Sequence, residues 1–342
     1  MISPDRLLVI RFSSLGDIVL TAPVTHALRQ RFPQTEIVYA TKRLYEPLVA
    51  QLPGVDRIIC FDEEDGIVRF IIQIRRERFD LILDLSANLR SRLVAAVAGS
   101  KITLRYRKRR LARMAMVYGP RSLIESRHTV DLYLETLKET GIEQADRLPD
   151  LAVPDQCRAA VADRLEAHGV GTSQLLIGMA PGASCLPKQW PARYFAAVAD
   201  HFVCTRQASI VLIGSGDDSA ATQAVKAAMT TPVIDWTGQC DLSLLPAVIQ
   251  RCQTLLTNDT GPMHVASAVR TPVVGLFGPT HPCLGFTPLG LHDASLSMDL
   301  SCSPCSLHGA RRCRFKTNAC LETLQVDRVI QEVTRSLDRQ AL

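Results

Sequence analysis

The chain has 342 residues, of which 47% are hydrophobic and 21% are charged, and its formal net charge at pH 7 is +5. This composition excludes an intrinsically disordered chain, and the length favours two domains over one. No apolar run reaches the roughly 18 residues that span a bilayer, and the N-terminus carries no basic leader, so we expect a cytosolic protein.

The first half of the sequence alternates short apolar runs with segments of helical periodicity. The expected strands are Arg6–Arg11, Glu36–Ala40, Arg57–Phe61, Phe79–Asp84 and Ile102–Leu104. The expected helices lie near 17–32, 44–51, 66–77 and 88–98. Because Pro23 falls inside the first of these helices, we expect a kink or a late start there. The alternation indicates a parallel sheet that helices cover on both faces.

A helical segment at His128–Thr140 ends this half, and the polar stretch Glu143–Asp155 is typical of a linker. The alternation of strands and helices then starts again. The expected strands are Leu175–Ala180, Ser209–Ile213, Val233–Ile234, Thr254–Thr257 and Val273–Phe277. The last amphipathic stretch, Val326–Leu337, is predicted as a helix that would be able to pack back across the domain boundary.

These elements predict an α/β protein with two doubly wound parallel sheets. We expect an N-terminal domain at 1–150, a C-terminal domain at 151–325 and a C-terminal helix at 326–342. In such sheets ligands bind beyond the carboxyl ends of the strands. The loops expected to face the crevice between the domains are therefore 12–17, 181–190, 214–218 and 258–264.

The most informative motif is the stretch Asn258 to His264 (NDTGPMH), which follows an apolar run and precedes small residues. It predicts a strand, a tight turn and a helix N-terminus. The first backbone N–H groups of a helix lack helical partners and the positive end of its dipole points outward, so a phosphate is favoured there. The alternative is structural: Asp259 or Thr260 caps the helix, and Gly261 with Pro262 turns the chain.

A second glycine turn follows the strand expected at Arg6–Arg11. The loop Phe12 to Asp17 (FSSLGD) has one glycine where the dinucleotide-binding fingerprint GxGxxG has three, so an NAD site is a poor match. Asp17 is expected at the start of the next helix. There it either caps the helix or presents a carboxylate to the cleft.

Two further loops follow strands of the second half. The loop Pro181 to Pro191 (PGASCLPKQWP) carries a glycine for close backbone approach, and its Lys188 is either a diphosphate ligand or an ordinary exposed lysine. The loop Gly214 to Asp218 (GSGDD) offers two carboxylates. One is expected to cap the helix that follows, and the other to accept hydrogen bonds from ribose hydroxyls.

The segment Lys101 to Arg113 (KITLRYRKRRLAR) carries seven Lys/Arg and no acidic residue. Such a concentration of positive charge favours a polyanion. A solvated basic face and an anionic membrane lipid are two further interpretations. Nucleic acid is less favoured, because no zinc-finger, helix-turn-helix or RNA-binding sheet signature accompanies the segment.

Four segments, in this order and spacing, resemble the ADP-heptose:lipopolysaccharide heptosyltransferases (glycosyltransferase family 9, of the heptosyltransferase II type), over most of the chain. They are Phe12–Asp17, Pro181–Ala183 with Lys188 and Trp190-Pro191, Asp259–His264, and Gly275–Thr280 (GLFGPT). The resemblance implies a GT-B fold, in which two Rossmann-like domains face a central cleft. The acceptor would bind the N-terminal domain and the nucleotide sugar the C-terminal one. It also implies inversion at the anomeric carbon without a metal.

The resemblance also implies roles for single residues. Asp17 would be the general base that removes a proton from the acceptor hydroxyl, a function typically worth about 10²–10⁴ in rate. Lys188 and the backbone N–H groups of Thr260 and Gly261 would hold the ADP diphosphate and stabilise its charge as it leaves. The other implied nucleotide-sugar residues are Gly182, Asp217 for the ribose, Asp259, and His264, whose alternative is a buried, hydrogen-bonded histidine.

On the acceptor side, the resemblance implies the lipid A–Kdo or already heptosylated inner core of lipopolysaccharide. The residues expected to bind it are Ser13, Ser14, Gly16, Arg90, Arg92 and Arg105. Arginine suits phosphates and acidic sugars because its planar guanidinium binds them bidentately. We therefore expect a cytoplasmic enzyme with peripheral contact to the cytoplasmic face of the inner membrane, and no nucleic-acid partner.

The chain has eleven cysteines, and four of them lie close together: Cys302, Cys305, Cys313 and Cys320. Their density suits a structural zinc or iron, although their spacing does not match the paired CxxC zinc knuckle. Iron binds to a related segment in some similar transferases. Packed thiols and a regulatory disulfide are the alternatives. We expect catalysis itself to require no cofactor.

The sequence thus predicts an inverting heptosyltransferase that uses ADP-heptose. The main alternative is a related GT-B transferase that uses another nucleotide sugar, or one that heptosylates a protein hydroxyl. A non-catalytic nucleotide-binding protein is a further alternative, which the presence of Asp17 disfavours. A nucleic-acid-binding protein would require salt-dependent binding to a generic duplex.

Overall fold

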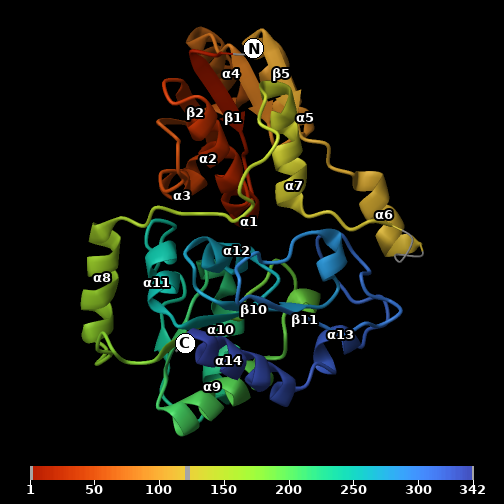
Figure 1. Ribbon diagram of the computed structural model, residues 1–342. Helices are drawn as coiled ribbons and strands as arrows, with labels where there is room; N and C mark the ends of the chain where they lie inside the picture. Colours follow the sequence, from red (N-terminus) through yellow and green to blue (C-terminus); the bar gives the residue numbers. More distant parts are fainter. Residues whose placement is uncertain (1–2, 120–123, 341–342) are drawn as a thin grey trace. The chain divides into compact units, whose positions relative to one another are not determined.

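The computed structural model describes residues 3–119 and 124–340 (Figure 1). Contacts divide the chain into two compact units, the first formed by Met1–Arg109 with Arg127–Ala152 and the second by Arg110–Ser126 with Val153–Leu342. Each unit contains one sheet in which all strand pairs are parallel. The predicted fold class is confirmed, and the predicted domain boundaries stay a prediction.

The sheet of the first unit has the strand order β3-β2-β1-β4-β5. Its strands are β1 (Arg6–Ile10), β2 (Glu36–Lys42), β3 (Arg57–Phe61), β4 (Leu81–Asp84) and β5 (Ile102–Arg105). All five strands predicted for the first half are therefore present. The strand order reverses between β1 and β4, which is the point where doubly wound sheets bind ligands. The loop after β1 carries Asp17.

Of the two outcomes predicted at Pro23, a kink or a late helix start, the first unit shows the late start. Two helices, α1 (Leu15–Val19) and α2 (Ala22–Arg31), replace the single one expected near 17–32. Pro23 is the second residue of α2, where its missing N–H costs nothing, so the chain breaks before it instead of kinking at it. The other helices of this unit are α3 (Glu46–Val49), α4 (Gly66–Glu77), α5 (Leu89–Ala98) and α7 (Thr129–Leu134).

An aromatic cluster fixes the start of the loop after β1. The rings of Phe12, Phe61 and Phe70 lie 5.4–5.8 Å apart between centroids, in tilted or edge-to-face geometry. All three side chains are at most 4% exposed. Pairs of this kind add about 0.5–1.5 kcal/mol to the hydrophobic contribution. The residue that opens the loop is therefore part of the core, which restricts the positions open to the residues that follow.

The sheet of the second unit has the order β11-β10-β9-β6-β7-β8. Its strands are β6 (Leu176–Ala180), β7 (Ser209–Leu212), β8 (Ile234–Asp235), β9 (Thr254–Asn258), β10 (Val273–Phe277) and β11 (Ala294–Ser297). The first five were predicted. Edge strand β11 was missed because its sequence, ASLS, contains only one large apolar side chain, Leu296.

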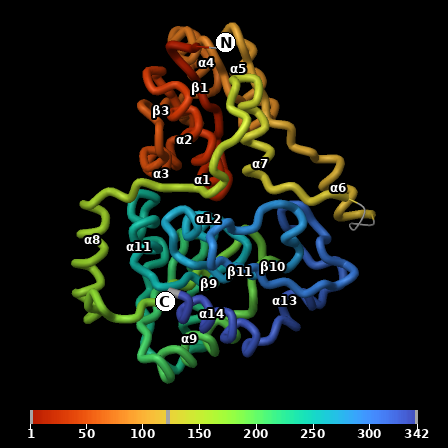
Figure 2. Tube along the Cα trace, in the orientation of Figure 1, coloured from red at the N-terminus to blue at the C-terminus, as the bar shows by residue number. Residues whose placement is uncertain are grey.

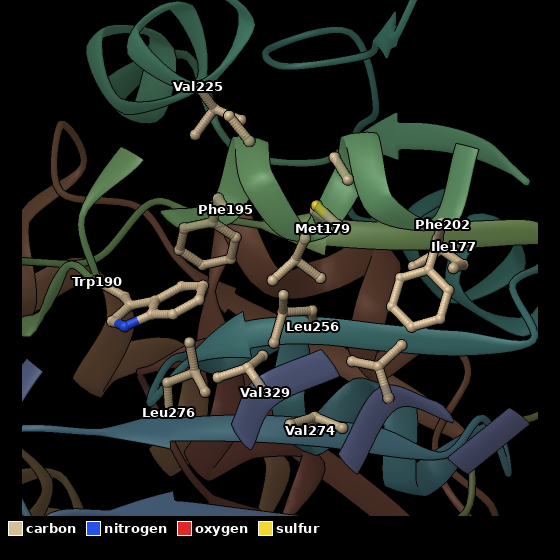
Figure 3. Close-up of a cluster of buried hydrophobic side chains, with 14 of the residues drawn as sticks. Ile177, Met179, Trp190, Phe195, Phe202, Val225, Leu256, Val274, Leu276 and Val329 are labelled. Carbon is tan, nitrogen blue, oxygen red and sulfur yellow. The ribbon is translucent and has the colours of Figure 1, made fainter. Parts of the chain in front are cut away.

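The core of the second unit lies between this sheet and its helices (Figure 3). The helices of the second unit are α6 (Arg110–Tyr118), α8 (Asp155–Glu166), α9 (Ala192–Arg206), α10 (Ser219–Ala228), α11 (Leu245–Arg251), α12 (Gly261–Ala268), α13 (Ala319–Glu322) and α14 (Val326–Gln340). The C-terminal helix α14 packs against α9, β9 and β10, and its Val329 is fully buried (Figures 2 and 3). Residues 341–342 of the predicted helix lie outside the described residues.

Helix α6 follows β5 in the chain but belongs by its contacts to the second unit. There it meets the 3₁₀ turn η6 (Pro282–Leu284). None of the helices in the described part of the chain has the length and apolarity needed to cross a membrane.

Candidate functional site

The carboxylate of Asp17 lies in the first turn of α1, directly after the central strand of its sheet. Its Oδ2 lies 2.5 Å from Nη2 of Arg11 and accepts hydrogen bonds from the hydroxyl (3.0 Å) and the backbone N–H (3.4 Å) of Ser14. The hydroxyl of Tyr133 on α7 donates to Oδ1 over 3.4 Å. Ser14 is the N-cap residue, and Asp17 reaches back to it as the third residue of the helix.

Arg11 orients this carboxylate. Its side chain is buried, and Nη1 donates to the carbonyl oxygen of Leu85 over 2.7 Å. Its guanidinium also lies 5.8 Å from the ring centroid of Tyr133. Sequence reasoning missed Arg11 and Tyr133. The signal for Arg11 was a charged residue at the end of an apolar strand, whereas Tyr133 is 116 residues away from Asp17 and gave no local signal.

The environment lowers the pKa of Asp17 from its usual value. Burial acts to raise this pKa, but the charge of Arg11 and the hydrogen bonds from Ser14 outweigh the burial. Asp17 is therefore ionised throughout the neutral range and can accept a proton. Because a low pKa makes a weak base, a catalytic contribution must come mainly from the position of the carboxylate relative to the proton.

Replacing Arg11 with methionine is expected to raise the pKa of Asp17, because an opposite charge at this distance typically lowers a carboxyl pKa by about 1–3 units. The base form would then be lost at higher pH, so the acid limb of the kcat/KM profile moves up by a similar amount. Arg147→Met removes another arginine–aspartate ion pair of the first unit, with Asp131, and should leave the limb in place. An unmoved limb in folded Arg11→Met would contradict this electrostatic account.

The residues predicted to bind the acceptor lie in two places in the first unit. Ser13, Ser14 and Gly16 share the loop and first helical turn that carry Asp17. The exposed Arg90 and Arg92 lie on α5, and the guanidinium of Arg90 is 4.8 Å from the ring centroid of Phe61.

Arg105 is already engaged within the sheet of the first unit. Its Nε donates over 3.0 Å to Oδ2 of Asp84, whose side chain is fully buried. Arg105 thus neutralises the buried carboxylate of Asp84. The arginine therefore has a structural task in addition to any contact with an acceptor.

A second site lies in the second unit, around Asp259. Its Oδ2 lies 3.0 Å from Nζ of Lys188 and accepts a hydrogen bond of 2.6 Å from the hydroxyl of Thr280. The side chains of Lys188 and Asp259 are only 11% and 13% exposed, so solvent screens this pair little. Lys188 is therefore not the ordinary exposed lysine of the alternative interpretation. Thr280 was not among the predicted site residues, although it ends the GLFGPT segment.

Helix α12 begins beside this ion pair. Its N-cap residue is Thr260, and among the described residues that side chain makes no capping hydrogen bond to the first turn. Its hydroxyl instead donates to the carbonyl oxygen of Asn258 over 3.3 Å. The side-chain capping alternative is thus not observed for Thr260. The helix N-terminus offers N–H groups and the positive end of the dipole at a lysine, a combination that suits a phosphate.

The loops after β6 and β7 pack against each other through Asp218. A Cβ on Gly182 would lie 2.0 Å from Oδ1 of Asp218, so the chain needs glycine at this position. Oδ2 of Asp218 accepts hydrogen bonds of 2.8 Å from the backbone N–H and the hydroxyl of Ser215. Asp218 thus takes the local capping task. Asp217 is exposed, which leaves its carboxylate accessible.

Asn258, the last residue of β9, ties the loop after β6 to the sheet. Its Oδ1 accepts a hydrogen bond of 3.0 Å from the backbone N–H of Trp190, and its Nδ2 donates to the carbonyl oxygen of Pro181 over 2.8 Å. Its side chain is fully buried. The loop that carries Lys188 is therefore held at both ends by one amide side chain.

Replacing Asn258 with alanine should destabilise the second unit by about 1–3 kcal/mol for each buried group left without a partner. Both tryptophans, Trp190 and Trp236, lie in this unit, so tryptophan fluorescence during thermal unfolding reports its transition. Asn88→Ala, which removes the cap of α5 in the first unit, is the control and should leave the transition in place. An unchanged transition in Asn258→Ala would show that the loop is not held in this way.

The remaining predicted residues are His264 and the cysteines. His264 is buried within α12, 6% exposed. Backbone N–H groups of Cys305 and Ser306 donate to the carbonyl oxygen of Pro279, so the cysteine-rich segment supports the loop that ends in Thr280. Gly309, with φ of +99°, approaches Lys188 so closely that an added Cβ would lie 2.8 Å from Cδ of that lysine.

The metal site predicted at Cys302, Cys305, Cys313 and Cys320 is not supported. Among the described residues, which include all four, no group of three or more His, Cys, Asp or Glu side chains is arranged to hold a metal ion. None of the cysteines forms a disulfide. Burial raises the pKa of the Cys305 thiol and brings that of Cys320 to about 11, so both act as packed thiols at neutral pH.

Comparisons with known proteins give the family and the fold of this chain. The sequence profile of glycosyltransferase family 9 (heptosyltransferase) matches residues 67–315. The chain is 28% identical over 306 residues to lipopolysaccharide heptosyltransferase 2 of Escherichia coli K12, which covers 84% of this chain and 86% of the relative. A glycosyltransferase family 9 structure from Veillonella parvula superposes with a TM-score of 0.85 at 26% identity, covering 99% of both chains. The structure of E. coli ADP-heptose lipopolysaccharide heptosyltransferase II superposes with a TM-score of 0.78 at 24% identity, covering 98% of this chain and 100% of the other.

Proposed function

Because the chain belongs to glycosyltransferase family 9, the heptosyltransferases, we propose that it transfers heptose from ADP-heptose to the inner core of lipopolysaccharide, with inversion at the anomeric carbon. The observation that carries the proposal is the family match, which extends over 67–315. The lipopolysaccharide acceptor is supported by the relative from E. coli, whose name specifies lipopolysaccharide. The enzyme is a glycosyltransferase with the GT-B fold.

The second unit would bind the donor. The anionic diphosphate of ADP-heptose would lie at the N-terminus of α12, against the N–H groups of Thr260 and Gly261 and the ammonium of Lys188. Asp259 lies 3.0 Å from that ammonium and restricts its position. Asp217 is exposed and would accept hydrogen bonds from the ribose hydroxyls, and Gly182 and His264 would be further contacts to the nucleotide sugar.

The first unit would bind the acceptor and supply the base. Asp17 removes the proton from the acceptor hydroxyl while that oxygen forms a bond to the anomeric carbon and the bond from this carbon to the diphosphate breaks. The electron pair of the broken bond leaves with ADP, whose increased negative charge Lys188 and α12 stabilise. In this scheme the lysine and the helix do the work that a divalent cation does in other transferases, so no metal is required.

The acceptor would be held through its anionic groups. Arg90 and Arg92 are exposed on α5, and Ser13, Ser14 and Gly16 adjoin the base. The phosphates and acidic sugars of a lipid A–Kdo core are ligands that such guanidinium groups bind bidentately. Since this acceptor is a lipid, the enzyme would work on the cytoplasmic face of the inner membrane as a peripheral protein.

Nucleotide selectivity tests the donor half of the proposal. A ligand present at 100 times its Kd stabilises the folded state by about 2.7 kcal/mol. ADP is therefore expected to raise the melting temperature of the tryptophan-reported transition, and UDP and GDP to raise it less at equal concentration. A preference for UDP or GDP would instead support the alternative, a related GT-B transferase that uses another nucleotide sugar.

A further inference from the structure

Helix α6 has an apolar face that is exposed. Leu111 and Tyr118 are 83% and 80% exposed, Met114 is 36% exposed, and Ala115 is exposed as well. These four positions follow the spacing i, i+3, i+4 and i+7, so their side chains share one side of the helix. In a surface helix of a globular protein the solvent-facing side is ordinarily polar. The solvent-facing side of α6 is therefore apolar where a polar side is usual.

The other side of α6 holds the helix on the second unit. Met116 is buried, 4% exposed, and the guanidinium of Arg113 lies 4.6 Å from the ring centroid of Phe286. Beyond the helix, the hydroxyl of Ser126 donates to the carbonyl oxygen of Cys283 in η6 over 2.7 Å. The side of α6 that carries Met116 therefore already packs against the second unit. The apolar face with Leu111 and Tyr118 is a separate, exposed side of the helix.

The segment around α6 is strongly basic. From Arg107 to Gly119 the chain carries five Lys/Arg and no Asp or Glu. This short stretch alone carries as much positive charge as the formal net charge of the whole chain, +5. Arg107 and Arg110, just before and at the start of the helix, are exposed. An apolar face bordered by cations suits a surface that is both anionic and apolar.

We propose that α6 docks the enzyme on an anionic lipid bilayer, with Leu111, Met114 and Tyr118 in the interfacial region and the flanking arginines against lipid phosphates. Lys and Arg are attracted to the negative surface potential of such a bilayer, and Tyr is suited to the interface between headgroups and hydrocarbon. A second copy of the chain is a poorer occupant, because a symmetric contact through α6 would bring the same positive charges together.

This inference deepens the proposed function, on which it rests for the glycolipid acceptor, and it can be measured without any transfer. The experiment is flotation of the full chain with two kinds of vesicle, phosphatidylcholine alone and phosphatidylcholine mixed with phosphatidylglycerol. Wild type should float with the mixed vesicles and be released by high salt, because screening weakens the contacts between arginine and phosphate.

A double variant, Leu111→Ser with Tyr118→Ser, should lose at least about tenfold in partitioning to the mixed vesicles, which corresponds to about 1.4 kcal/mol of lost apolar burial. Leu291→Ser is the matched control: Leu291 is 89% exposed in the same unit but not on α6, and its replacement should change nothing. Equal binding by wild type and the double variant, or an equal loss in Leu291→Ser, would overturn the proposal.

Sedimentation equilibrium without vesicles tests whether a second copy of the chain, and not a bilayer, covers the apolar face. If the wild-type protein is a dimer, the double variant is a monomer and neither binds vesicles, then the apolar face is a contact between copies and the docking proposal is wrong. Vesicle binding by wild type together with failure to transfer heptose would leave the docking proposal intact while the proposed function fails.

Discussion

Replacing Asp17 with asparagine is expected to lower kcat by a factor of at least about 10², because general-base assistance is typically worth about 10²–10⁴. The amide keeps the shape of the side chain but cannot accept the proton. Residues proposed for the nucleotide lie in the second unit, so the affinity for ADP should not change. The measurement is steady-state transfer at saturating donor, with ADP binding determined separately.

Asp131→Asn is the matched control for this prediction. Asp131 lies on α7, the helix that supplies Tyr133, and forms an ion pair of 2.5 Å with Nε of Arg147. The control therefore removes a similar charge from the first unit at a residue that pairs with Arg147 and not with Arg11 or Asp17, and kcat should stay at the wild-type value. Full activity in Asp17→Asn would sink the assignment of the base, whatever its effect on stability.

Replacing Lys188 with methionine is expected to lower kcat/KM for the donor by about 10²–10³, the loss typical of removing one donor to a developing negative charge. ADP affinity should fall as well, because the diphosphate is present both in the donor and in ADP. The variant also leaves Asp259 without its cation, at a position only 13% exposed. The measurements are donor kinetics and isothermal titration with ADP.

Lys226→Met is the control for Lys188. Lys226 lies on α10 in the same unit, 3.8 Å from Oδ2 of Asp235, and its removal should leave donor kinetics unchanged. A double variant, Lys188→Met with Asp259→Asn, removes both charges. If the double variant recovers ADP affinity fully, the loss in the single variant came from the unpaired carboxylate and not from a missing phosphate contact.

The strands and the positions of the functional loops were predictable because both depend on local sequence. Apolar runs such as Leu7–Ile10 and Ile210–Ile213 mark most of the predicted strands, and Asp17, Lys188 and Asp259 lie in the segments that follow β1, β6 and β9. The sequence predicted an interruption of the helix at Pro23 but not its form, because both a kink and a new helix start accommodate a residue without a backbone N–H. Strand β11 was not predicted because a single buried side chain, Leu296, forms neither an apolar run nor an alternating pattern.

The partners that tune the site were not predictable, because they come from distant parts of the chain. Tyr133 reaches Asp17 across 116 residues, and Asn258 holds Trp190 across 68. The close approach of Asp218 to Gly182 was likewise not predictable, because the two residues are 36 positions apart in the sequence. Only the folded chain reveals that these residues meet, because no local periodicity connects them.

The most direct test of the account is heptose transfer by the wild-type protein from ADP-heptose to defined truncated lipopolysaccharides, followed by mass spectrometry of the acceptor. The account predicts one added heptose on a lipid A–Kdo or singly heptosylated acceptor. The product should be absent with the Asp17→Asn variant and present with the control variant Asp131→Asn. If the protein binds ADP but no glycolipid acceptor gains heptose, while a protein hydroxyl does, the lipopolysaccharide function is contradicted and the protein-modifying alternative takes its place.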